Sequence, residues 1–127
     1  VNATNGDLTL VAGSPFAAGS SPENIAVDPS GKFVYVTNRF SDNVSAYTIN
    51  STTGALTPVA GSPFAAGGLP VGIAVDPSGK FVYVTNSDDD NVSAFAINAT
   101  SGALTPVAGS PFTAGSSPSG VAVSPPK

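Results

Sequence analysis

The densest cluster of potential ligand atoms in this chain is the acidic run SDDDN at residues 87–91. Carboxylate and amide oxygens are the donors that Ca²⁺ takes from proteins, so Asp88, Asp89 and Asp90 are candidate metal ligands. The run lacks the glycine and the final glutamate of an EF-hand loop, and the matching run at residues 39–43 reads RFSDN. A solvated loop is therefore the alternative to a Ca²⁺ site, and we expect no other cofactor.

Two further carboxylates, Asp28 and Asp76, begin identical DPSG motifs. As a pair they are candidates for acid–base chemistry. The order Asp, Pro, Ser, Gly also matches the preferences of a type I turn, in which the Asp side chain caps the turn. We expect the capping role at both positions.

Nucleophilic catalysis has no evident set of residues here. The chain contains many Ser and Thr residues but no His, no Cys and no G-x-S-x-G motif. Lys32 and Lys80 each open an apolar run, where we expect solvated strand ends and not activated bases. The sequence therefore identifies no catalytic residue.

Five asparagines begin Asn-X-Ser/Thr triplets, the acceptor motif of N-glycosylation: Asn2, Asn43, Asn50, Asn91 and Asn98. The five are copies of two motif positions in a chain rich in Ser and Thr, so chance formation is the alternative. Occupied sites would belong to a secreted or cell-surface protein. An extracellular location is what we expect.

The composition, with 14 Gly, 12 Pro and 41% hydrophobic residues, favours an all-β protein with many turns. Four Lys and Arg residues stand against eight Asp and Glu residues, which gives a net charge of −4. So few positive charges argue against a nucleic-acid partner and against binding to an anionic membrane surface. No apolar run is long enough to cross a bilayer, so we expect no membrane insertion.

The elements that must position these residues come in repeats. Residues 13–60 and 61–108 are two copies of a 48-residue unit and are identical at 37 positions. The first 12 residues match the end of the unit, and the last 19 match its beginning. We therefore divide the chain into an outer strand of a partial unit at 1–12, unit 1 at 13–60, unit 2 at 61–108 and the start of unit 3 at 109–127.

Each unit contains four predicted strands separated by turn signals, in the first unit at residues 24–27, 32–37, 44–49 and 55–60. Along the second strand, both alternating sets of side chains are largely apolar, so both faces of the sheet should be covered. A four-stranded antiparallel sheet repeated every 48 residues favours the blades of a β-propeller, whose periods are about 40–50 residues.

The motif Tyr35-Val36-Thr37-Asn38, its copy at residues 83–86 and the preceding AVDPSGKFVYV resemble the YVTN-type β-propeller repeat. This repeat occurs in the lactonase-like seven-bladed family typified by 6-phosphogluconolactonase. GALTPVAGSPFAAG is similar to the outer strand and blade linker of that family. The resemblance implies a lactonase-type hydrolase whose polar and charged groups, often His, Arg and Glu, surround a central channel. This chain has one Arg, one Glu and no His, so no catalytic residue of the family is assigned here.

A ligand surface is suggested by positions that differ between the two units. Glu23, Arg39, Phe40 and Leu69 are such positions, and we treat them as candidate ligand-binding residues. In a propeller, the loops that carry them commonly surround the mouth of the channel. Simple variation of loop residues is the alternative.

About 2.6 units cannot close a ring of about 4–8 blades, so the chain by itself is incomplete as a propeller. It is a segment of a longer propeller, or several copies complete one another in a ring or filament, or it is a lone monomer. We expect the remaining blades or further copies of the chain as partners. The start at Val1, where no Met stands, agrees with a processed product or a piece of something longer.

Three functions remain open. Because an active site needs different groups at one point and repetition supplies the same group everywhere, we predict a non-catalytic structural or interaction module that assembles with further blades or chains. The first alternative is a lactonase-like hydrolase whose catalytic residues lie in absent blades. The second is a propeller that binds a carbohydrate, such as a glycan, or another partner. The sequence thus favours a protein that is not an enzyme.

Overall fold

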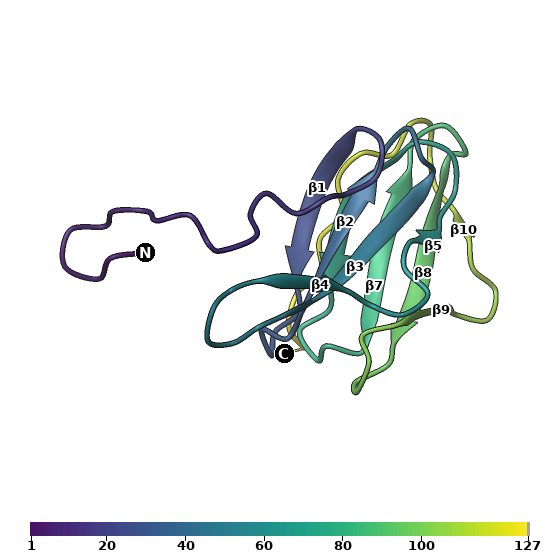
Figure 1. Cartoon of the computed structure of the whole chain (residues 1–127). Helices are drawn as coiled ribbons and strands as arrows, with labels where there is room; N and C mark the ends of the chain where they lie inside the picture. The colour runs from purple at the N-terminus through teal and green to yellow at the C-terminus, as the bar shows by residue number, and fades with distance from the viewer. Residues whose placement is uncertain (127) are drawn as a thin grey trace.

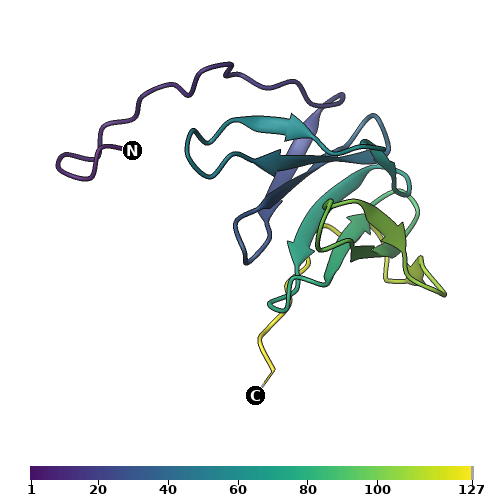
Figure 2. The same cartoon turned by 60° about the horizontal axis from the view of Figure 1, so that its bottom comes forward.

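The computed structural model describes residues 1–126, and within them it contains two antiparallel sheets and no helix. The first sheet consists of β1 (Pro22–Val27), β2 (Phe33–Asn38), β3 (Asn43–Ile49), β4 (Leu56–Pro58) and β5 (Phe64–Ala65). The second consists of β6 (Pro70–Val75), β7 (Phe81–Asn86), β8 (Asn91–Ile97), β9 (Leu104–Pro106) and β10 (Phe112–Thr113). The sheets lie face to face (Figures 1 and 2), as two neighbouring blades of a propeller do, which confirms the predicted fold class. No helix of the described residues is long and apolar enough to cross a membrane.

The outer position of each blade is divided between two short strands, where the sequence predicted one. In the first blade, β4 pairs with the Tyr47–Ile49 end of β3, and β5 pairs with its Asn43–Val44 end. The chain between them turns at Gly61, whose φ of 90° a side chain would disfavour. Between the two strands, the Ala46 N–H donates to the Ser62 hydroxyl oxygen at 2.8 Å instead of to a backbone carbonyl. The prediction of a single strand at residues 55–60 is therefore corrected.

The DPSG motifs form the β1–β2 and β6–β7 turns, and their aspartates cap them as predicted. Asp28 Oδ1 accepts hydrogen bonds from the backbone N–H groups of Lys32 at 2.9 Å and Phe33 at 2.8 Å. Its Oδ2 accepts from the backbone and the hydroxyl of Ser30. Asp76 makes the equivalent bonds in the second blade. Both aspartates are thus committed to the turn.

The main core lies between the two sheets. Alternate residues of β2 point into it, and Tyr35 is fully buried there against Val82 and Val84 of β7. Val34 and Val36 point to the opposite face of the first sheet, where they pack with Tyr47. Both faces of β2 are therefore covered, as its apolar pattern predicted, and each fully buried side chain of this size stabilises the fold by about 1.5–3 kcal/mol.

The YVTN motif connects the blades through its polar atoms. The Tyr35 hydroxyl donates to the Gly102 carbonyl of the next blade at 2.9 Å, and the Thr37 hydroxyl donates to the Val71 carbonyl at 3.0 Å. Asn38 works within its own blade: its amide oxygen accepts a linker N–H, and its amide nitrogen donates to two side chains of β3. Tyr35 and Thr37 thus link neighbouring blades, whereas Asn38 fixes the linker within its own blade.

The two ends of the chain lie outside the sheets. Residues 1–12, predicted as an outer strand, form no strand and extend away from the body (Figure 1), because the chain supplies no inner neighbour for them to pair with. Residues 114–126 also form no strand, yet the Ser119 carbonyl accepts a hydrogen bond from the Thr85 hydroxyl at 2.9 Å. Ser119 thus occupies the place, relative to the second blade, that Val71 has relative to the first.

Candidate functional site

Four loop segments meet at one end of the two blades, and we call this end the loop edge. It comprises the linker segments 18–23 and 66–71 and the turns 39–42 and 87–90. The Arg39 N–H donates to the Ser21 carbonyl at 2.9 Å, and the Ser87 N–H donates to the Leu69 carbonyl at 3.0 Å. Each turn is therefore tied to the linker that precedes its own blade.

Variation between the two repeat units gathers at this edge. Of the 11 positions at which the units differ, seven lie in or directly beside these segments in the first blade: Ser20, Ser21, Glu23, Asn24, Arg39, Phe40 and Ser41. Asn24 immediately follows the linker on β1. The loop edge thus collects most of the positions at which the repeats present different side chains.

Arg39 and Phe40 form a projecting pair on the β2–β3 turn. The guanidinium carbon of Arg39 lies 5.6 Å from the centroid of the Phe40 ring, within the range of a cation–π contact. Phe40 is 64% exposed, whereas the Nε of Arg39 is buried and has no hydrogen-bond partner. Arg39 therefore retains an unused donor in a partly dehydrated position, beside an exposed aromatic ring.

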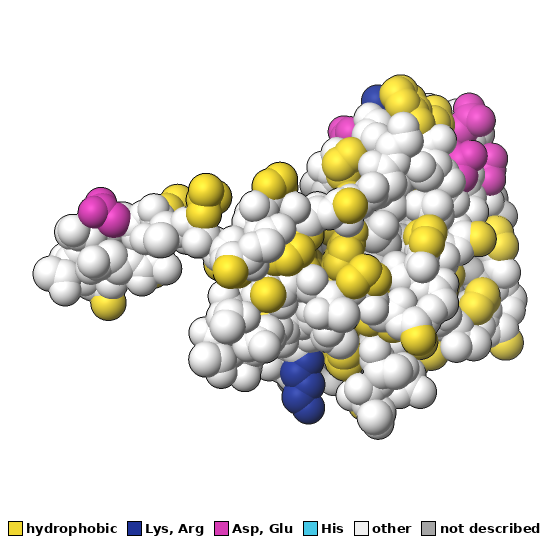
Figure 3. Space-filling model, in the orientation of Figure 1, with side chains coloured by type: hydrophobic (Ala, Val, Ile, Leu, Met, Phe, Trp, Pro, Cys, Tyr) yellow, Lys and Arg dark blue, Asp and Glu magenta, His cyan; other side chains and the backbone are white. Residues whose placement is uncertain are grey.

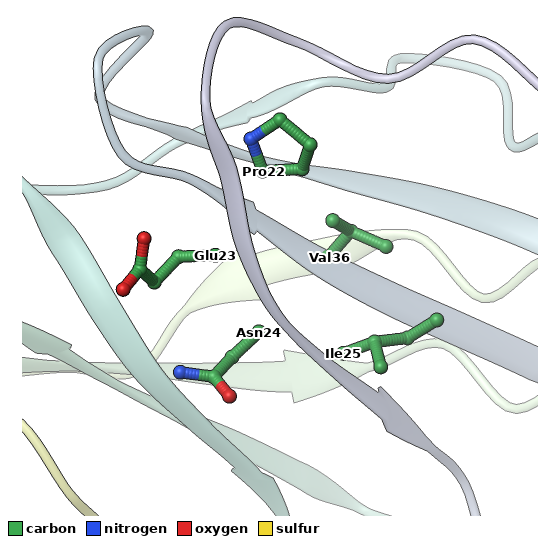
Figure 4. Close-up of a pocket in the computed structure, with 5 residues that line it drawn as sticks. All are labelled: Pro22, Glu23, Asn24, Ile25 and Val36. Carbon is green, nitrogen blue, oxygen red and sulfur yellow. The ribbon is translucent and has the colours of Figure 1, made fainter.

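Glu23 lines a pocket of about 300 Å³ together with Pro22, Asn24, Ile25 and Val36. Figure 4 shows the Glu23 and Asn24 side chains on one side of the β1 ribbon and the apolar members on the other. The Glu23 position coincides with an irregularity in the β1–β2 pairing between Pro22 and Asn24. Glu23 thus lies at the edge of the pocket, with its carboxylate across β1 from the apolar wall.

Leu69 has a largely structural position in the linker. Its backbone adopts a φ of 50°, its N–H donates to Asp42 Oδ1 at 3.0 Å, and its carbonyl accepts from the Ser87 N–H and hydroxyl. Its half-buried side chain remains a candidate contact for a ligand.

Sequence reasoning missed the role of Asp42, although its presence in both units was a signal that it belongs to the scaffold.

The acidic run lies on the β7–β8 turn, and acidic side chains gather at this end of the molecule (Figure 3). Asp89 Oδ2 accepts the Gly68 N–H at 2.8 Å, and Asp90 Oδ1 accepts the Ser117 N–H at 2.8 Å. Within residues 1–126, no three acidic side chains converge as metal ligands would. The Ca²⁺ site stays a prediction, and two of its three carboxylates already hold backbone groups.

The turn aspartates lie away from the loop edge, at the β1–β2 and β6–β7 turns. Burial acts to raise the pKa of Asp28, but the hydrogen bonds from Ser30, Phe33 and Lys32 outweigh it and hold the pKa below its ordinary value. The pKa of Asp76 is lowered in the same way. Both carboxylates are thus kept ionised by turn geometry, and neither lies with the other candidates.

The five sequon asparagines fall into two structural groups. Asn2, Asn50 and Asn98 are exposed, and their side-chain oxygens cap turns by accepting N–H groups two and three residues later. Asn43 and Asn91 begin β3 and β8, and their oxygens accept hydrogen bonds from Asn38 and Asn86. Glycosylation stays a prediction, and the exposed group is the accessible one.

The family model for lactonases with a seven-bladed β-propeller matches residues 1–123 of this chain. A 6-phosphogluconolactonase of Formosa agariphila is 46% identical over 44 residues, which are 35% of this chain and 12% of that protein. The chain therefore spans a small part of this relative.

Several solved structures share the fold of this chain. A putative 6-phosphogluconolactonase of Bacteroides fragilis has a TM-score of 0.72 and 25% identity over 78% of this chain and 27% of its own. The periplasmic gluconolactonase of Pseudomonas aeruginosa has a TM-score of 0.71 and 26% identity over 86% of this chain and 30% of its own. A hydrazine synthase of Kuenenia stuttgartiensis, at 23% identity and a TM-score of 0.61 over 88% of this chain and 29% of its own, shares the fold alone.

These findings contradict the prediction that the chain is a non-catalytic structural module, because the matching family is one of lactonases and two neighbours are described as gluconolactonases. They also give no support to ring or filament assembly or to the view that the protein is not an enzyme. The error arose from treating repetition of the scaffold as repetition of the site. With the family model matching nearly its whole length, the chain belongs to the seven-bladed β-propeller lactonases.

Proposed function

We propose that the protein of which this chain forms about two and a half blades is a hydrolase that opens a lactone ring, and that the loop edge forms part of its active site. The family match over residues 1–123 is the observation that carries the proposal. The gathering of seven variable positions at the loop edge supports the location. The remaining blades of a longer chain would complete the ring and the channel.

Lactone hydrolysis needs two kinds of group that the loop edge offers. A base takes a proton from the attacking water, and a donor stabilises the negative charge that develops on the ring carbonyl oxygen before the ring C–O bond breaks. Glu23 supplies a carboxylate at the edge of a pocket of about 300 Å³, and the half-buried Arg39 supplies a guanidinium with several N–H donors. We assign the base to Glu23 and the donor to Arg39.

The charge of the loop edge favours an uncharged sugar lactone over a phosphorylated one. One guanidinium, that of Arg39, stands among five carboxylates: Glu23, Asp42, Asp88, Asp89 and Asp90. A phosphate group brought to this edge would experience net repulsion over the ~8–10 Å range of electrostatic interaction at physiological salt. A gluconolactone without phosphate is therefore the substrate we propose.

One of the comparisons bears on where the protein is located. The Pseudomonas aeruginosa neighbour is described as periplasmic, so a place outside the cytoplasm is compatible with this fold and family. The extracellular location inferred from the sequons stays a prediction.

The test is the rate at which the full-length protein and its variants hydrolyse glucono-δ-lactone, measured from the acid that the reaction releases. We expect Glu23→Gln to lower kcat by about 10²-fold and Arg39→Gln to lower kcat/KM by about 10²–10³-fold. Asp7→Asn and Lys80→Gln carry matched charge changes away from the loop edge and should leave the rate unchanged. The assignment would be contradicted if Glu23→Gln and Arg39→Gln both kept full activity while unfolding like the wild type.

A further inference from the structure

Two grooves of matching construction lie along the outer parts of the blades, one in each repeat unit. The first lies between linker residues 17–19 and Tyr47 of β3, and the second lies between residues 65–67 and Phe95 of β8. Every position that lines the first groove has its counterpart, 48 residues later, in the lining of the second. The volumes are about 230 Å³ and about 300 Å³, respectively.

At the matching positions, the grooves differ in one hydroxyl group. In the first, the phenolic oxygen of Tyr47 donates a hydrogen bond to the Ala17 carbonyl at 2.6 Å. In the second, Phe95 occupies the Tyr47 position and has no hydroxyl to offer to Ala65, the counterpart of Ala17. The larger groove is thus the one in which a donor is missing.

The carbonyl of Ala65 is free to accept from this groove. The Ala66 N–H donates to the Asp42 carbonyl at 3.0 Å, so the hydrogen-bonded pairs of the β3–β5 ladder fall at Ala66 and Phe64. Ala65 pairs with Asn43 between them, at a position whose carbonyl points away from β3. The first groove shows which group suits this point, because there a hydroxyl fills it.

Three other polar groups face the second groove. Ser93 accepts a hydrogen bond from Asn86 at 2.8 Å, and Ser110 accepts the Ala94 N–H at 2.9 Å, so both hydroxyls retain their hydrogen for donation. Asp89 uses Oδ2 for the Gly68 N–H and keeps Oδ1, and it has no counterpart in the lining of the first groove. The groove therefore holds both acceptors and donors at close range.

We propose that the groove between residues 65–67 and Phe95 is a binding site for a small neutral polyol. A polyol hydroxyl would donate to the Ala65 carbonyl in place of the missing phenol, a second would donate to Asp89, and others would accept from the serines. The exposed Pro106 and Pro111 offer an apolar wall to the CH groups of such a ligand, and Phe95, which is 3% exposed, adds little surface to it.

Other ligand classes fit less well. Asp89 repels an anion, an ammonium group has no acceptor for the serine hydroxyls, and an apolar ligand would cover the acceptors of Ala65 and Asp89 without pairing them. The groove lies on the outer strands, away from the Glu23 pocket. Residues 66, 67 and Asp89 also belong to the loop edge, but neither Glu23 nor Arg39 lines the groove, so the inference does not depend on the catalytic roles proposed for those two residues.

The test is titration of the ¹⁵N-labelled intact protein with D-sorbitol, followed by the amide shifts of Ala66, Gly67 and Ala94. We expect saturable shifts of these amides and no saturable shift at the counterpart amides of Ala18 and Gly19. Phe95→Tyr should lower the affinity at least 10-fold, because the new hydroxyl would occupy the Ala65 carbonyl. This variant restores a residue that the first unit already accommodates, so it should fold.

The matched variant is Tyr47→Phe, which removes the hydroxyl from the first groove. It should leave sorbitol binding at the second groove unchanged and create a saturable response at Ala18 and Gly19. Asp89→Asn should weaken binding several-fold, whereas Asp88→Asn, a neighbour outside the groove lining, should not. Shifts that rise linearly without saturation, or equal affinity in wild type and Phe95→Tyr, would overturn the proposal.

Discussion

The hydroxyl of Thr37 on β2 donates a hydrogen bond of 3.0 Å to the backbone carbonyl of Val71 on β6. The same oxygen accepts the Asn24 N–H at 3.0 Å, so one side chain joins its own inner strand to that of the next blade. Thr85 repeats the contact toward Ser119 at 2.9 Å. The junction is therefore a property of the repeat.

Thr37→Val keeps the shape of this buried side chain but removes both hydrogen bonds. We expect the free energy of unfolding of the protein to fall by about 1–3 kcal/mol, because buried backbone groups lose their partners. Thr48→Val is the control, since the Thr48 hydroxyl makes one long, exposed contact of 3.4 Å with Thr57. Urea denaturation compares the two, and equal losses would contradict the junction's importance.

Asn38→Ala should be more damaging still. Asn38 is fully buried, and its amide makes three hydrogen bonds of 2.8–3.0 Å to the linker and to β3. Loss of three bonds with buried partners predicts a decrease in unfolding free energy of about 2–4 kcal/mol. Asn50→Ala, which removes an exposed turn cap, should cost less than about 1 kcal/mol. A loss at Asn38 no larger than that at Asn50 would argue against the network.

Gly102→Ala tests the close approach of the blades. A Cβ at Gly102 would clash with Cδ1 of the buried Phe33, and the φ of 80° adds strain. Gly31 has a similar φ of 73° and open space around it, so Gly31→Ala isolates the strain, about 1–2 kcal/mol. Thermal and urea unfolding should show Gly102→Ala losing about 1–3 kcal/mol more. Equal effects would mean that the blades separate easily.

The turn aspartates predict how stability depends on pH. Their folded-state pKa values are depressed below the ordinary value of 3.8, so the stability they add is present above that value and is lost as pH falls through the folded-state pKa. Asp28→Asn should lower the unfolding free energy at neutral pH and flatten its decline below pH 3.8. Unfolding measured from neutral to acid pH checks this, with Asp7→Asn as an exposed control. An unchanged acid limb in Asp28→Asn would contradict it.

Much of the fold follows from local signals in the sequence. The two apolar faces of KFVYVT predicted a strand covered on both sides, and DPSG predicted a turn with an Asp cap. The division of the outer strand into β4 and β5 was not predictable in the same way. Strand β5 has only two residues, and its pairing with Val44 depends on the segment before it, in which the Ser62 hydroxyl accepts the Ala46 N–H. Short strands are held by tertiary partners and leave little local pattern.

The candidate site was only partly accessible from sequence. Variation between units identified Glu23, Arg39 and Phe40, and the structure brings their loops to one edge. The roles of Asp89 and Asp90 in holding linker N–H groups were hidden, since those partners are 21 and 27 residues away. A run of acidic residues in the sequence indicates local negative charge. The hydrogen-bond partners of those residues depend on how the blades pack, which the run itself does not show.

Membership in the seven-bladed β-propeller lactonases leads us to expect that the full-length protein opens lactone rings. The most direct measurement is the initial rate of glucono-δ-lactone hydrolysis by the full-length protein, corrected for the rate in buffer at the same pH. We expect a rate that saturates with substrate, is proportional to enzyme concentration and exceeds the rate with 6-phosphoglucono-δ-lactone. Hydrolysis of neither lactone above the buffer rate would contradict it.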